Sequence, residues 1–136
     1  MRIAALLLFS IAACSPPPEQ PAATTSETSV SIVVASPQTG AHVSSPLHVE
    51  GTAPGDWFFE AQFPAELRSA DGALIAEAPA RAQADWMTER PVPYAADLEF
   101  DGERETQATL VLKEDMPSGL PGQREISIPV VLKPAD

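Results

Sequence analysis

The sequence predicts an all-β protein whose folded part is an antiparallel β-sandwich of about seven short strands. Three observations predict this class. Segments with apolar residues at every second position recur along the chain. Turn-forming Gly, Pro, Asp and Ser residues separate these segments roughly every 8 to 12 residues. The 15 prolines are spread so widely over the 136 residues that no stretch offers three clean turns of helix.

The predicted strands follow in chain order. Their apolar positions are Val30, Ile32 and Val34; Leu47 and Val49; Phe63, Ala65 and Leu67; a strand from Leu74; Tyr94 to Phe100; Ala108 to Leu112; and Ile126, Ile128, Val130 and Leu132. Asp71-Gly72 predicts a two-residue hairpin turn before Leu74. Because proline cannot donate to a ladder, Pro64 and Pro129 predict that their strands lie at sheet edges or bulges.

These strands are polar on one side, which favours two sheets packed face to face. The chain has one cysteine, Cys14, so the sandwich contains no disulfide. An immunoglobulin-like sandwich without a disulfide fits this pattern best. About 100 residues are enough for one such domain, which we place at residues 30–134.

The N-terminus has the layout of a secretory signal peptide. Arg2 precedes an apolar stretch from Ile3 to Ala13. At 1.5 Å per residue, about 11 residues cover roughly half of a bilayer core, too little to span it. Ile11-Ala12-Ala13-Cys14 resembles the bacterial lipobox, which implies that residues 1–13 are removed and that the Cys14 sulfur carries a diacylglycerol.

The resemblance also implies a location and a tether. Ser15 favours the outer membrane, facing the periplasm, in a bacterium with two membranes, because similar lipoproteins with aspartate there stay at the inner membrane. Residues 14–29 contain Pro16, Pro17, Pro18 and Pro21 and no apolar periodicity. They predict a partly polyproline II tether between the lipidated cysteine and the domain.

The charge balance excludes two classes of partner. The chain has 8 basic and 19 acidic residues, a net charge of -11. An acidic surface repels phosphate backbones, so we expect no nucleic-acid partner. It also repels anionic headgroups, so the membrane partner is reached through the anchor at Cys14 rather than a basic face.

Residues for catalysis or metal binding are scarce. The only histidines are His42, in a turn-like stretch, and His48, on the polar side of a strand. No serine stands in a nucleophile-elbow context, and Glu103 and Glu105 belong to a solvated turn. The sequence therefore predicts no catalytic residues, no metal site and no cofactor.

Five segments together carry a family resemblance. They are Val33 to Gly51, Phe63 to Ala76, Asp85-Trp86-Met87, Val92-Pro93-Tyr94, and Pro117-Ser118-Gly119 followed by Ile128-Pro129-Val130. In order and spacing they resemble the immunoglobulin-like domain named from bacterial spore germination proteins (Gmad-type). The resemblance implies an immunoglobulin-like fold in a cell-envelope protein with a binding role, and it implies no catalytic residues.

The candidate binding residues are the consecutive aromatics Trp57, Phe58 and Phe59. Successive side chains of a strand point to opposite faces, so we expect at least one of these rings outside the core. Exposed aromatic rings bind sugars or partner surfaces. Trp86, in contrast, is expected at the core or its edge.

These observations favour one functional hypothesis over two alternatives. The favoured reading is a non-enzymatic, lipid-anchored envelope protein whose domain binds another envelope protein or a cell-wall glycan. A small enzyme of cell-wall turnover is the first alternative. The second is a structural accessory subunit with no ligand of its own.

Overall fold

The computed structural model describes residues 31–116 and 122–135. The predicted signal peptide, Cys14, the tether and the Pro117-Ser118-Gly119 turn lie outside these residues. The described residues form eight strands and one short 3₁₀ helix: β1 (Val33–Ser36), β2 (His42–Val43), β3 (Leu47–Ala53), η1 (Gly55–Trp57), β4 (Gln62–Ser69), β5 (Leu74–Ala82), β6 (Val92–Leu98), β7 (Thr106–Lys113) and β8 (Glu125–Leu132).

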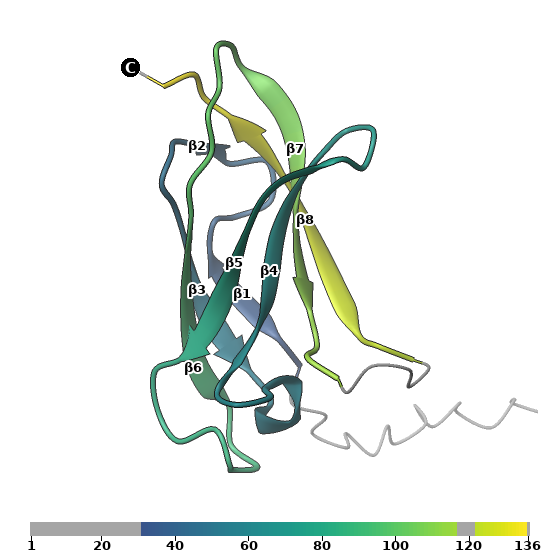
Figure 1. Ribbon diagram of the computed structural model, residues 1–136. Helices are drawn as coiled ribbons and strands as arrows, with labels where there is room; N and C mark the ends of the chain where they lie inside the picture. Colours follow the sequence, from purple (N-terminus) through teal and green to yellow (C-terminus); the bar gives the residue numbers. More distant parts are fainter. Residues whose placement is uncertain (1–30, 117–121, 136) are drawn as a thin grey trace, which may run out of the picture.

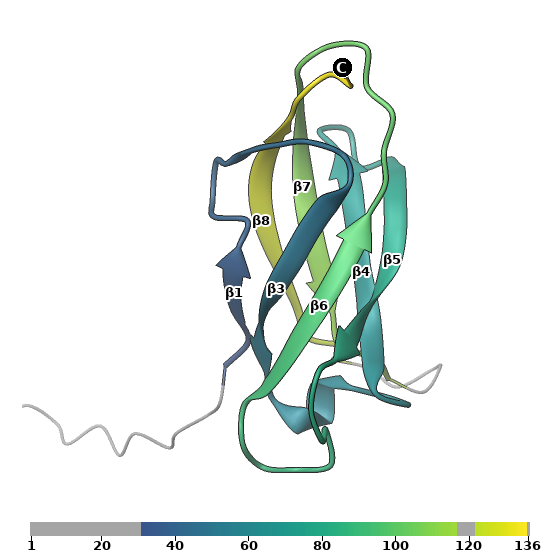
Figure 2. The ribbon, with the colours of Figure 1, turned by 90° about the vertical axis from the view of Figure 1, so that its left-hand side faces the viewer.

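The strands form one sheet that curls into two layers. Their order is β1-β3-β6-β5-β4-β7-β8-β2, and every neighbouring pair is antiparallel except β2 with β8. Strand β5 pairs with β4 along most of its length but with β6 only at Arg81↔Ala95 and Ala82↔Tyr94. The sheet folds over at this corner, so that β1, β3 and β6 lie in front of β4, β7 and β8 in Figure 2. The predicted β-sandwich is confirmed.

The core lies between the two layers and follows the predicted alternation. Leu47 and Val49 of β3 are buried, whereas His48 and Glu50 between and after them are exposed. The largest fully buried side chains come from both layers: Tyr94, Phe63, Leu67, Leu98, Leu110, Leu112, Val49, Val92 and Val130. This apolar core, rather than a disulfide, is what holds the described layers together.

The expectation that Pro64 places its strand at an edge is wrong, because β4 pairs with both β5 and β7. Pro64 lies opposite Pro79 of β5, and a pair of residues without N–H groups must be a non-hydrogen-bonded pair of the ladder. The pairing of β4 with β7 begins one residue later, at Ala65. At Pro64 itself, β4 is therefore paired only with β5. Proline is tolerated at this position because no hydrogen bond to β7 is required there.

Pro129 fits the expectation more closely. It pairs with Thr109 of β7 on one side, while β2 covers only Val131 and Leu132 on the other. The Pro129 carbonyl accepts a 2.7 Å hydrogen bond from the Gly40 N–H on the side away from β7. The Pro129 nitrogen, which has no hydrogen to donate, faces the same side, so no hydrogen bond of the ladder with β7 is lost.

The expectation that His42 lies in a turn is wrong, and the structure has an additional strand there. His42 and Val43 form β2, which pairs in parallel with Val131 and Leu132. The Val131 and Lys133 N–H groups donate to the carbonyls of Ala41 and Val43. Two residues are too few for an alternating pattern, so only the tertiary pairing defines this strand.

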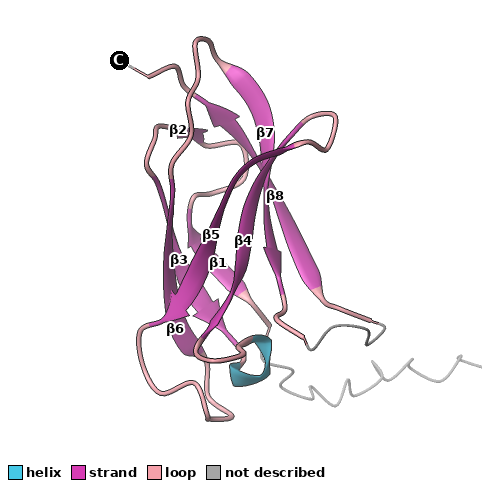
Figure 3. Ribbon diagram, in the orientation of Figure 1, coloured by secondary structure: helices cyan, strands magenta, loops and turns pink. Residues whose placement is uncertain are grey.

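The two ends of the sandwich differ in what they carry. At the lower end in Figure 1 the described chain begins, and η1 and the loop between β5 and β6 lie together there. The β4–β5 turn and the C-terminal end of β8 lie at the upper end. Figure 3 shows η1 as the helical element in an otherwise β structure. Within residues 31–116 and 122–135, no helix has the length and apolar character that crossing a bilayer requires.

Candidate functional site

The three consecutive aromatics lie at the lower end of the sandwich, and they do not form a strand. Trp57 ends η1, and Phe58 follows in an extended conformation. Trp57 is 3% exposed and Phe58 is 4% exposed, whereas Phe59 is 50% exposed. The tight 3₁₀ turn directs two successive rings into the core, which strand alternation does not allow. Of the three predicted binding residues, only Phe59 presents its ring to solvent.

Phe63 of β4 organises the buried aromatics. Its ring centroid lies 5.8 Å from Trp57, 5.1 Å from Phe58 and 5.0 Å from Tyr94, all at edge-on angles. Such edge-to-face pairs are favourable because the positive ring edge meets the negative face. Trp57 and Phe58 therefore close the lower end of the core and are unavailable as binding surfaces.

Close backbone packing fixes η1 in place. A Cβ atom on Gly55 would lie 2.4 Å from the carbonyl oxygens of both Trp86 and Thr88, so only glycine fits. Trp86 itself is half-buried and packs against the core, as predicted. The loop between β5 and β6 is thereby held against η1.

An ion cluster ties η1 to β7 and β8. Arg124 donates from Nε to Glu114 Oε2 at 2.9 Å and from a terminal nitrogen to Glu114 Oε1 at 2.6 Å. The same guanidinium lies 3.0 Å from Asp56 Oδ2, and its carbon lies 5.6 Å from the centroid of the Trp57 ring. The hydrogen bonds from Arg124 outweigh burial and lower the pKa of Glu114. Glu114, only 8% exposed, is therefore a neutralised structural carboxylate.

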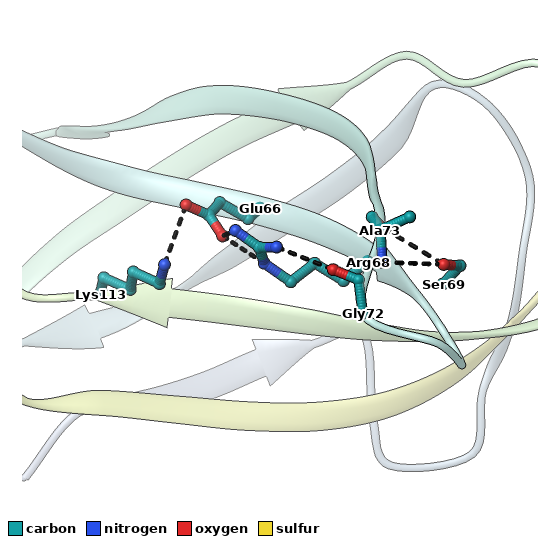
Figure 4. A network of polar contacts seen from close by, with 6 residues as sticks. All are labelled: Glu66, Arg68, Ser69, Gly72, Ala73 and Lys113. Atoms are coloured by element: carbon teal, nitrogen blue, oxygen red, sulfur yellow. Dashed lines mark hydrogen bonds and ion pairs between the residues drawn. The ribbon is translucent and has the colours of Figure 1, made fainter.

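A second neutralised carboxylate lies on the outer face of the sheet. Glu66 of β4 is buried although it alternates with the core positions Ala65 and Leu67. Figure 4 shows it between Lys113, at 3.1 Å, and Arg68, whose Nε lies at 2.6 Å. Burial alone would raise the pKa of Glu66, but the hydrogen bonds from Lys113 and Arg68 lower it.

A strained turn carries Phe59. Phe59 and Gln62 exchange two backbone hydrogen bonds, of 2.9 and 3.2 Å, around a loop made of Glu60 and Ala61. Both loop residues have positive φ, 50° for Glu60 and 65° for Ala61, as a type I′ turn requires. Asn and Gly are the residues that favour such positions, and each other residue costs on the order of 1 kcal/mol there.

A hollow of about 530 Å³ opens beside this turn on the outer face of the sheet. It is lined by residues 62–64 of β4, residues 77–79 of β5, and Asp115. We call it the β4–β5 hollow. The cross-strand pair Pro64 and Pro79 contributes an apolar surface to it, and Gln62 links it to the turn. Because Phe59 lies directly opposite Gln62, its side chain lies on the same face as the hollow.

The carboxylates at the hollow are not neutralised as Glu66 and Glu114 are. Burial, reinforced by the charge of Glu60, raises the pKa of Asp115. Glu77 lies opposite Glu66, whose charge Arg68 and Lys113 already balance. Within the described part of the chain, none of Glu60, Glu77 and Asp115 forms an ion pair. Cations lie close by as well: Arg81 is opposite Gln62, and Arg68 and Lys113 bind Glu66, which is directly opposite Glu77.

The histidines lie elsewhere. His48 Nδ1 is 2.7 Å from Asp97 Oδ1 on β6, and this hydrogen bond raises the pKa of His48. His42 Nδ1 lies 3.7 Å from Glu105 Oε2. No group of three or more His, Cys, Asp or Glu side chains suited to a metal ion occurs among the residues that the structure describes. A second hollow, of about 310 Å³ between β1 and β8, has no charged residue in its lining.

The family comparison agrees with this fold. The immunoglobulin-like domain of bacterial spore germination matches residues 31–119. The chain belongs to this family. The matched residues include β1 to β7, the aromatic segment and Asp115, whereas β8 lies beyond them. No curated protein and no solved structure matches the chain at a significant level.

Sequence reasoning missed most of the hollow. The pairing of Pro64 with Pro79 was accessible, because Pro64 lies seven residues before Asp71 and Pro79 lies seven after Gly72. A hairpin centred on that turn places the two prolines opposite each other. The predicted two-residue turn itself is wrong, because the Ser69 N–H donates to the Ala73 carbonyl across a loop of residues 70–72. A register shift between Leu67 and Arg68 then restores the pairing of Pro64 with Pro79. No sequence pattern indicated Asp115, because its position beside the hollow depends on where the pairing of β7 with β4 ends.

Proposed function

We propose that the protein is a non-enzymatic, lipid-anchored cell-envelope protein whose immunoglobulin-like domain is an interaction module. The observation that carries this proposal is the exposed ring of Phe59, which is paired across the turn with Gln62 in the lining of the β4–β5 hollow. Aromatic anchors next to concave apolar surfaces are the usual centres of protein interfaces. Phe59 lies on a strained turn, and strained backbone is concentrated at binding and catalytic sites.

The family supports a binding role over a catalytic one. The immunoglobulin-like fold is not built around catalytic residues, and in such domains function lies in surfaces and loops. The hollow has two carboxylates in its lining but no histidine, serine or cysteine to act as a nucleophile with its base. An interaction module therefore accounts for the site better than an enzyme of cell-wall turnover.

The proposed anchor is Cys14. Its support is the lipobox-like Ile11-Ala12-Ala13-Cys14, and Ser15 favours the outer membrane with the domain facing the periplasm. The described chain begins at the lower end in Figure 1, the end where η1 lies just before Phe59 in the chain.

The binding role is tested by photo-crosslinking in the host bacterium. A photoreactive phenylalanine analogue replaces Phe59 in one variant and Leu74 in a matched control. Both positions are 50% exposed, but Leu74 begins β5 beside the β4–β5 turn, which lies at the other end of the domain. We expect a discrete crosslinked product from position 59 and none from position 74.

A third variant, Phe59→Ala, separates binding from folding. Because the ring is half-exposed, its removal changes the free energy of unfolding by less than about 1 kcal/mol. Loss of an interface anchor typically costs about 2 kcal/mol of binding. If positions 59 and 74 give the same crosslinking pattern, or neither gives a product, the domain does not bind through this end.

The anchor is tested separately with Cys14→Ser. The wild-type protein should partition into detergent and incorporate labelled fatty acid, because thioether-linked acyl chains hold it in the membrane. The variant should do neither. Normal processing and membrane retention of the Cys14→Ser protein would rule out lipidation at this residue.

A further inference from the structure

We propose that the β4–β5 hollow binds a basic segment of a partner polypeptide, whose Lys or Arg side chain is held by Glu77 and Asp115 while an adjacent apolar residue packs on Pro64 and Pro79. This inference rests on the proposed function, since it names the kind of partner that the interaction module takes.

Three features of the hollow point to a cationic occupant. Glu77 and Asp115 both line it, and Glu60 adds a third negative charge close to Asp115. Arg68 and Lys113 are bound to Glu66, opposite Glu77, and Arg81 lies opposite Gln62, so among the described residues Glu60, Glu77 and Asp115 are left without an ion pair. Elsewhere the protein neutralises its buried carboxylates internally, as Glu66 and Glu114 show. The charges at the hollow are left for a partner to neutralise.

The turn that carries Phe59 adds to the negative charge at the hollow. Glu60 occupies a left-handed position that Asn or Gly would adopt without strain. The chain instead has a carboxylate there, on the side that influences Asp115.

The apolar part of the hollow favours a polypeptide. Proline rings and the exposed Phe59 ring can pack against the methylene stem of Lys or Arg, and a guanidinium can stack on Phe59. A volume of about 530 Å³ accommodates a few side chains. Sugar hydroxyls can also donate to carboxylates, but a neutral glycan leaves their charge in place, whereas Lys or Arg neutralises it. Anionic lipid or nucleic acid would be repelled.

The test is a binding titration of the full-length, ¹⁵N-labelled protein in a neutral detergent, followed by NMR. The probe is a blocked peptide, acetyl-Gly-Pro-Leu-Lys-Pro-Arg-Gly-amide. Comparison ligands are the same peptide with glutamine in place of Lys and Arg, spermidine, and chitotetraose. We expect the basic peptide to shift the amide signals of Phe63, Ala78 and Asp115, and the glutamine peptide to leave them unchanged.

Matched variants locate the charge requirement. Glu77→Gln and Asp115→Asn should each weaken binding of the basic peptide about fivefold. Glu103→Gln, which removes the same charge from the loop between β6 and β7, should leave affinity unchanged. All three residues belong to the acidic excess, so net charge alone cannot produce this difference.

Other outcomes overturn the inference. Equal binding of the glutamine peptide shows that charge is not recognised, and spermidine binding as tightly as the peptide shows that no polypeptide is required. Shifts with chitotetraose alone assign the hollow to a glycan. If position 59 crosslinks a partner in cells while no basic peptide binds, the interaction module stands and only the basic partner is wrong.

Discussion

Glu114 and Asp115 are neighbours in the chain but differ in how the fold treats their charge. Glu114 faces Arg124 and has a lowered pKa, whereas Asp115 faces the β4–β5 hollow and has a raised one. Both backbone N–H groups are bonded, that of Glu114 to the Arg124 carbonyl and that of Asp115 to the Trp57 carbonyl. The difference therefore lies in the surroundings of the two side chains just after the end of β7.

Glu114 therefore contributes to the stability of the fold, whereas Asp115 belongs to the proposed binding site. On the inner side the carboxylate is satisfied by bidentate hydrogen bonds and closes the end of the core over Trp57. On the outer side a carboxylate is partly buried and repelled by Glu60, which destabilises the folded state. The proposed basic partner would relieve this repulsion.

The largest effect is expected from Glu114→Gln. The change leaves the Arg124 guanidinium with only Asp56 and removes a charge-assisted pair at a buried position. It should lower the free energy of unfolding by about 2 kcal/mol at pH 7. Urea unfolding measures this value, with Glu103→Gln as the matched charge control, which should change it by less than about 0.5 kcal/mol.

The stabilisation by Glu114 should also depend on pH. Because the pKa of Glu114 is lower in the folded state than its ordinary value of 4.5, the folded state binds fewer protons. The contribution of Glu114 to the free energy of unfolding is therefore fully present above pH 4.5, and it disappears as the pH falls through the lowered pKa of the folded state. The difference between wild type and Glu114→Gln should therefore shrink in acid. A difference that is constant down to pH 2 would show that the Glu114 charge contributes nothing.

The strands of the fold were predictable, and the reason is local. Alternating residues such as Leu47 and Val49, or Ile128 and Val130, determine a buried face wherever a strand is covered on one side. Strand β2 and the position of Pro64 were not predictable in this way, because both depend on which strand lies alongside. Tertiary pairing decides them, and two residues or one proline carry too little pattern to reveal it.

The site was predicted only in part, for a similar reason. Exposure of one aromatic was expected, but alternation could not select Phe59, because the 3₁₀ turn at Gly55–Trp57 buries two successive rings. Glu66 lies on the outer face, as its alternation with Ala65 and Leu67 indicates, but its burial there depends on the cross-strand partner Lys113 and on Arg68, which neutralise it. Asp115 could not be recognised because nothing in its neighbourhood in the sequence distinguishes it from Glu114.

The smallest change in stability, and the most direct test of the central claim, is expected for Asp115→Asn measured in two ways on the same protein. Removing a charge that the fold disfavours should leave the free energy of unfolding unchanged or raise it by up to about 0.5 kcal/mol. The affinity for the basic peptide should fall about fivefold in the same samples. A loss of more than about 1 kcal/mol in stability with unchanged affinity would contradict the account, because Asp115 would then be a structural residue like Glu114.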